Sequence, residues 1–185
     1  MRYPRARTVA CFLAILVATV TVAAPVPPAT EGPVIENYGA VYPVPGDAYN
    51  LVRGKRYKVV MDISGSGEFA MAINPHLDSA ARLLNMEARS GIDPHDLKLA
   101  LVVHGEATKD LLNDQAYREQ FGIYNPNTRL LDALESAGVE ILVCGQSAAA
   151  KGFRPADFNP ATRIAVSAMT AHVRLQAEGY VEIPF

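Results

Sequence analysis

The chain has 185 residues, with 17 lysines and arginines against 19 aspartates and glutamates and a formal net charge of −2. Half of the residues are hydrophobic and 19% are charged, which argues against a disordered chain. There is no basic surplus to favour nucleic acid as a partner, and two cysteines exclude a disulfide framework and a four-thiolate zinc site.

Residues 1–24 have the features of an export signal. A start with three arginines precedes an uncharged apolar run at 9–22, followed by small residues that offer a cleavage site near Ala24. The run is shorter than the roughly 20 apolar residues of an ordinary membrane span, and an uncleaved anchor is the alternative. We expect residues 1–24 to be removed and the mature protein to be periplasmic or secreted, without membrane contact after cleavage.

Removal of this segment changes the composition. It takes away three arginines, so the mature chain has 14 basic against 19 acidic residues and a formal net charge of −5. It also leaves one cysteine, Cys144, which is unusual in an oxidising compartment. Residues 25–54 are rich in proline and glycine and predict an N-terminal arm, whereas residues 55–185 have the size of one domain.

From residue 57 onward, short apolar runs alternate with helical patterns. In chain order we predict a strand at 57–63, a helix over 77–86 capped by Asn74, a strand at 97–103, helices at 107–121 and 128–137, a strand at 139–143, a strand or extended segment at 164–167, a helix at 171–178 and a last strand at 181–183. This alternation is typical of a three-layer α/β domain with a mostly parallel sheet.

Cys144 is the sharpest candidate for a functional residue. It directly follows the predicted strand 139–143, and Gly145, Gln146 and Ser147 then open a plausible helix. Parallel sheets bind ligands at the carboxyl ends of their strands, and free N–H groups at a helix start favour a thiolate. Gly145 would allow a substrate to approach the backbone closely. Cys144 is therefore a candidate nucleophile, and the alternative is a buried, inert cysteine.

His104 and Gly105 follow the second apolar strand. A histidine at a strand end can donate or accept a proton or bind an anion, and the alternative is a histidine that is hydrogen-bonded within its loop. If the strands that precede His104 and Cys144 are neighbours, the two side chains face one pocket. The candidate binding residues are His104, Gly105, Gly145, Gln146 and Ser147.

Other motifs are less complete. Residues 64–67 (Ser-Gly-Ser-Gly) lack the third glycine and the lysine of nucleotide-binding loops, which indicates a flexible connection. The four histidines have no metal-ligand spacing, so we expect no metal and no cofactor. Ser147 approaches the serine elbow of hydrolases, with Asp157 and His172 in the right order, but Ala149 replaces the final glycine of that motif.

Several short strings together resemble one protein family. They are Val-Val-Met-Asp-Ile at 59–63, Asn-Pro at 74–75, Val-Val-His-Gly at 102–105, Phe-Gly at 121–122 with Asn-Pro-Asn at 125–127, Gly-Val-Glu at 138–140 leading into Val-Cys-Gly-Gln-Ser at 143–147, and Gln-Ala-Glu-Gly-Tyr at 176–180. The chain is similar to the DsrE/DsrF-like family from about Lys58 to Phe185. The string Cys144-Gly145-Gln146-Ser147 is its most specific part.

The resemblance implies a fold and a chemistry. The family's fold is an α/β/α sandwich with a parallel sheet of about five strands, and its members are usually trimers or hexamers. In its sulfur-relay members a cysteine at the position of Cys144 accepts sulfur as a persulfide. The resemblance thus implies a sulfur carrier or sulfurtransferase that meets a small sulfur compound or an acceptor thiol. Lys151 and Arg154 lie within ten residues of Cys144 and could attract an anionic donor, and the alternative for them is a solvated helix end. The alternative is a non-catalytic small-ligand-binding or assembly protein of the same fold.

Overall fold

The two predicted strands at 57–63 and 97–103 form the centre of the sheet. In the computed structural model, which describes residues 27–44 and 48–184, β1 (Tyr57–Ile63) and β2 (Leu97–Val103) pair in parallel along their whole length. Beyond β2 come β3 (Glu140–Cys144) and the edge strand β4 (Thr162–Ala165), and β5 (Val181–Ile183) pairs with the other side of β1. The order is β4-β3-β2-β1-β5, five strands that are all parallel. The predicted signal, residues 1–24, lies outside the described residues.

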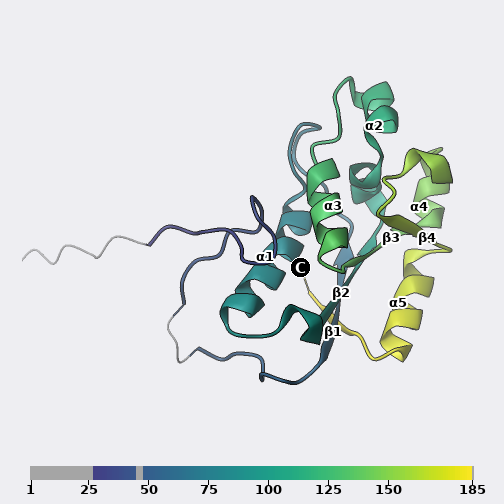
Figure 1. Ribbon diagram of the computed structural model, residues 1–185. Helices are drawn as coiled ribbons and strands as arrows, with labels where there is room; N and C mark the ends of the chain where they lie inside the picture. The colour runs from purple at the N-terminus through teal and green to yellow at the C-terminus, as the bar shows by residue number, and fades with distance from the viewer. Residues whose placement is uncertain (1–26, 45–47, 185) are drawn as a thin grey trace, which may run out of the picture.

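Helices cover both faces of this sheet (Figure 1). α1 (Pro75–Arg89) and α3 (Thr128–Ser136) pack on one face, here called the α1 face, over the large core that contains Met61, Leu101 and Val143. α5 (Ala168–Ala177) packs on the other, the α5 face, over a smaller cluster with the alternate strand residues Val60, Val102 and Leu142. The predicted three-layer α/β sandwich is confirmed.

Three predicted elements differ from the structure. The predicted helix 107–121 is a 3₁₀ helix at Gly105–Leu111 followed by α2 (Asp114–Phe121), because the Asn113 side chain accepts the N–H of Ala116 and starts a new helix. α5 begins at Ala168 rather than Ala171, since Ser167 caps it by accepting the N–H of Thr170. β4 ends at Ala165, two residues before the expected end.

The arm lies against α1. The side-chain oxygen of Asn85 accepts the N–H groups of Val34 and Ile35, and its amide donates to three arm carbonyls. The guanidinium of Arg89 donates to four further arm carbonyls, those of Thr30, Glu31, Gly32 and Val41. Two polar side chains of one helix therefore hold the backbone of residues 30–41.

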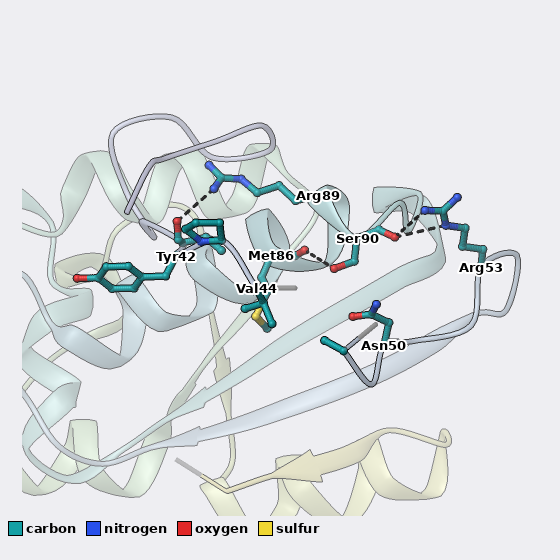
Figure 2. Close-up of a pocket in the computed structure, with 10 residues that line it drawn as sticks. Tyr42, Val44, Asn50, Arg53, Met86, Arg89 and Ser90 are labelled. Carbon is teal, nitrogen blue, oxygen red and sulfur yellow. Dashed lines mark hydrogen bonds between the residues drawn. The ribbon is translucent and has the colours of Figure 1, made fainter. Parts of the chain in front are cut away.

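A pocket of about 380 Å³ lies where the arm crosses the end of α1 (Figure 2). Tyr42, Val44 and Met86 give it an apolar side, and Arg53 closes it by donating to the carbonyl of Ser90. Because α1 runs back from the end of β1 toward the start of β2, this pocket lies at the amino ends of the strands. It is therefore remote from the carboxyl ends, where the candidate residues lie.

Candidate functional site

The topological switch point of the sheet lies between β3 and β4. β3 leads into the six-residue helix α4 (Gly145–Ala150), whose Ala148 packs in the core of the α1 face. β4 leads into α5 on the opposite face. Chains that leave neighbouring strand ends in opposite directions open a crevice, which is where open α/β sheets bind ligands. Cys144 lies at this switch point, opposite Ala165 in the register of β3 and β4, and it is buried, with 5% of the residue exposed.

The sulfur of Cys144 lies where α4 and α5 begin. It accepts the backbone N–H of Ser147 at 3.5 Å, and the backbone N–H groups of Gln146 and Ala168 also donate to it. Burial of Cys144 raises the pKa of its thiol, but the hydrogen bonds from Ser147, Ala168 and Gln146 outweigh burial, and the pKa is lowered. Donors from two helix starts thus stabilise the thiolate, which is the nucleophilic form.

Ser147 joins the cysteine loop to the end of β2. Its hydroxyl oxygen accepts the backbone N–H of Gly105 at 3.2 Å, and its side chain also hydrogen-bonds the sulfur of Cys144. A hydroxyl has a single proton, and a thiolate can only accept, so the proton of Ser147 points to the sulfur. Ser147 therefore acts on the thiolate directly and Gly105 acts through Ser147, while the role of either residue in binding a ligand stays a prediction.

Ser147→Ala is expected to slow the alkylation of Cys144 about fivefold near neutral pH, because one hydrogen bond of about 1 kcal/mol to the thiolate is lost. The rate is measured with iodoacetamide by intact mass spectrometry. Ser136→Ala is the matched control, since that hydroxyl donates to the carbonyl of Asp132 on the exposed end of α3. A Ser147→Ala rate equal to that of the wild type would show that the hydroxyl does not stabilise the thiolate.

Gly145 permits the close approach of the ends of β3 and β4. A Cβ atom at this position would lie 2.7 Å from the carbonyl oxygen of Ala165 and 3.2 Å from that of Val166. The side-chain amide of Gln146 also donates to the carbonyl of Val166 at 3.4 Å. Both predicted binding residues thus contact the turn between β4 and α5, and any contact with a ligand stays a prediction.

His104 lies beside Cys144 on the α5 face. The register of β2 and β3 places Val103 opposite Val143, and the N–H of His104 still donates to Ile63 in the ladder with β1. The next pair is therefore His104 and Cys144, on strands about 4.8 Å apart, and alternation directs both side chains to the α5 face. The two strands are adjacent, which is the condition that the sequence analysis set for His104 and Cys144 to face one pocket, and the shared pocket itself stays a prediction.

Asp62 is a residue of this site that the sequence analysis missed. Its oxygens lie 3.1 Å from Nε2 of His104 and 2.8 Å from Nε2 of His172, and Nδ1 of His172 lies 3.4 Å from Glu182. Burial raises the pKa of Asp62, but the two imidazoles outweigh burial and the pKa is lowered. The available signal was a carboxylate within an apolar strand, but its partners lie 42 and 110 residues away in the chain.

The cations that were expected to attract an anionic donor are paired. Lys151 lies 2.9 Å from Glu106, and Arg154 lies 2.7 Å from Asp157. The hydrolase triad is not assembled, because Asp157 pairs with Arg154 while His172 pairs with Asp62. This pairing removes the sequence basis for a serine hydrolase.

The glycine-serine loop at 64–67 is held in place rather than free. Lys109 donates to the hydroxyl of Ser66 at 2.6 Å, and the side-chain amide of Asn74 donates to the carbonyl of Gly65 at 2.9 Å. Across residues 27–44 and 48–184, no group of three or more His, Cys, Asp and Glu side chains is arranged to hold a metal ion. In the same part of the chain, no helix has the length and apolar character to cross a membrane.

Comparisons with known proteins agree with this fold. The sequence profile of the DsrE/DsrF-like family matches residues 58–185. A protein of unknown function from Methanobacterium thermoautotrophicum, MTH1491, has a similar structure with a TM-score of 0.54 and 19% identity, over 70% of this chain and 99% of that one. The ychN protein from E. coli gives 0.50 and 15% over 70% and 99%. These two structural similarities show the fold of the chain. No curated protein matches its sequence.

Proposed function

The chain belongs to the DsrE/DsrF-like family, and on that premise we propose that it is a sulfur carrier or sulfurtransferase that holds a persulfide on Cys144. The observation that supports this most strongly is the convergence of backbone N–H groups from α4 and α5 on the sulfur of Cys144. These N–H groups stabilise the Cys144 thiolate when it attacks a sulfur donor. They stabilise the same thiolate again when it leaves the persulfide.

The chemistry has two halves. In the first, the Cys144 thiolate attacks the outer sulfur of thiosulfate or a sulfur of polysulfide, a new S–S bond forms, and sulfite or a shorter polysulfide leaves with the electron pair of the broken bond. In the second, an acceptor thiol attacks the outer sulfur of the persulfide, and Cys144 leaves as a thiolate. A leaving thiol of lowered pKa departs faster, which favours the second half.

Cys144→Ser tests this proposal. Incubation of the mature chain, residues 25–185, with thiosulfate or polysulfide is expected to add one sulfur atom to the wild type and none to Cys144→Ser, because Cys144 is the one thiol of that chain and only a thiolate can form the persulfide. Intact mass spectrometry reads the addition. Cys11→Ser is the matched control for the full chain and is expected to load like the wild type. A folded wild type that gains no sulfur from either donor would contradict the proposal.

We further propose that the protein acts outside the cytoplasm, after cleavage near Ala24. The support is the sequence of residues 1–24, with its basic start and apolar run. Expression of the full chain in a bacterium, followed by fractionation and N-terminal sequencing, tests this. Mature protein in the periplasmic fraction that begins near residue 25 is expected, and full-length protein in the cytoplasm would contradict it.

The surface around α5 supports assembly into a homotrimer or homohexamer. Val166, Met169 and Val173 are 72%, 77% and 71% exposed, and Ile164 and Val181 are also exposed large apolar side chains. Apolar patches of this kind mark contact surfaces.

Val173→Glu is expected to shift the protein to smaller species in size-exclusion chromatography with light scattering. Val52→Glu on the arm, 64% exposed, is the control. A wild type that is monomeric at every concentration would refute the assembly.

A further inference from the structure

We propose that His104, positioned by Asp62, carries the proton in the second half of the sulfur transfer, so that the acceptor is a thiol in its neutral form. This inference rests on the proposed persulfide at Cys144. It assigns an acid-base role to a histidine that neither the family match nor the structural neighbours connect with any chemistry.

Asp62 holds His104 from a fixed position. Each of its two carboxylate oxygens contacts one imidazole, that of His104 at 3.1 Å and that of His172 at 2.8 Å. His172 comes from α5, and its other ring nitrogen lies 3.4 Å from Glu182 on β5. The carboxylate is therefore held between β2 and α5, and it can orient His104 as the carboxylate of a catalytic triad orients its histidine.

His104 follows β2, the strand that lies between those that carry Asp62 and Cys144. Asp62 lies on β1 and Cys144 on β3, the two strands that flank β2, and all three side chains are on the α5 face. Nε2 of His104 lies 3.1 Å from a carboxylate oxygen of Asp62. Among the described residues, Nδ1 of His104 has no hydrogen-bond partner. The side chain is 30% exposed, so a small thiol can reach it.

One charged group contacts this ring, and three further titratable groups lie on neighbouring elements. Asp62 on β1 contacts the ring, His172 on α5 contacts the other oxygen of Asp62, and Glu182 on β5 lies 3.4 Å from His172. Glu106, just past the end of β2, is neutralised by Lys151. The carboxylate of Asp62 is thus the charged group in contact with His104, and it stabilises the imidazolium that forms when the ring takes a proton.

The step balances without an added oxidant or reductant. The acceptor R–SH gives its proton to His104 while its sulfur bonds to the outer sulfur of the Cys144 persulfide anion. The bond between that outer sulfur and Sγ breaks, and its electron pair stays on Cys144 as the thiolate. His104 then returns the proton to the outer sulfur, so the products are R–S–SH and the Cys144 thiolate. Loading from thiosulfate moves no proton, because sulfite leaves as a dianion.

Only the second half of the transfer moves a proton, so loading and transfer are measured separately. Wild type, His104→Gln and Asp62→Asn are loaded with thiosulfate, freed of donor, and mixed with a small thiol across the pH units below the thiol pKa, about 8.5. All three are expected to load, which shows that they are folded. The wild-type transfer rate is expected to vary little with pH, whereas in both variants it falls about tenfold per pH unit, because only the thiolate fraction of the acceptor then reacts.

Two further variants complete the test. Asp62→Glu keeps a carboxylate and is expected to recover most of the wild-type pH profile, and His95→Gln, exposed before the start of β2, is expected to match the wild type. A wild type that does not load overturns the proposed function itself. A loaded wild type whose transfer follows the thiolate fraction, or variants with the wild-type profile, overturns the role of His104 and leaves the carrier function standing.

Discussion

Gly145→Ala is expected to slow both the alkylation of Cys144 and its loading with sulfur about 100-fold. The new methyl group would meet the carbonyl oxygen of Ala165 at 2.7 Å, a backbone atom that cannot move away cheaply. The turn after β4 must therefore shift, and with it the N–H of Ala168 that donates to the sulfur. A displacement of about 1 Å in a reactive site can cost about 100-fold in rate. Stopped-flow alkylation with iodoacetamide measures the effect.

Gly138→Ala is the matched control for this substitution. Gly138 has φ +84°, which strains an alanine, but a Cβ there meets nothing within 4 Å. It is expected to lose about 1 kcal/mol of unfolding free energy and to keep the wild-type alkylation rate. A Gly145→Ala protein that reacts as fast as Gly138→Ala would show that the close contact of β3 and β4 does not shape the reactivity of Cys144.

Asp110→Ala is expected to have the largest effect on stability, about 3 kcal/mol or more. Asp110 is 1% exposed, and its carboxylate accepts from Nζ of Lys109 at 2.7 Å and from Asn74 at 2.8 Å. Its backbone carbonyl accepts from Asn125, which in turn holds Asn127. Removal of the carboxylate leaves the largely buried ammonium of Lys109 without its counter-ion and the buried amide of Asn74 without one of its two acceptors.

Urea unfolding measures this loss, and Glu178→Ala provides the comparison. Glu178 also pairs with a basic side chain near it in sequence, Arg174 at 2.9 Å, but both side chains are exposed. Exposed pairs contribute little, so Glu178→Ala is expected to change stability by less than about 1 kcal/mol. Equal losses in the two variants would show that the buried polar network around Asp110 does not stabilise the fold.

The sheet and Cys144 could be predicted because their signals are local. The runs at 57–63 and 97–103 are mostly apolar, and both form strands with those bounds. Cys144 was placed at the end of a strand next to a glycine, and it is the last residue of β3. The fold class followed from the alternation of such runs with helical spacing.

The partners of these residues could not be predicted, because they act across the chain. In the sequence, Asp62 is only a polar residue within a strand. Its partner His172 lies 110 residues away in the chain, on α5. Ala168 donates to Cys144 through its backbone, which leaves no pattern in the side chains. The capping side chain of Asn113 was a local signal that was overlooked, and it would have divided the predicted helix 107–121.

The pH dependence of Cys144 alkylation tests the central claim most directly. Because the hydrogen bonds from Ser147, Ala168 and Gln146 lower the thiol pKa against the effect of burial, the thiolate persists to lower pH than in an ordinary cysteine. The account predicts a midpoint of the rate profile below about 8.5, the value of an unperturbed cysteine. A midpoint at or above that value, or a thiol that does not react in the folded protein, would contradict it.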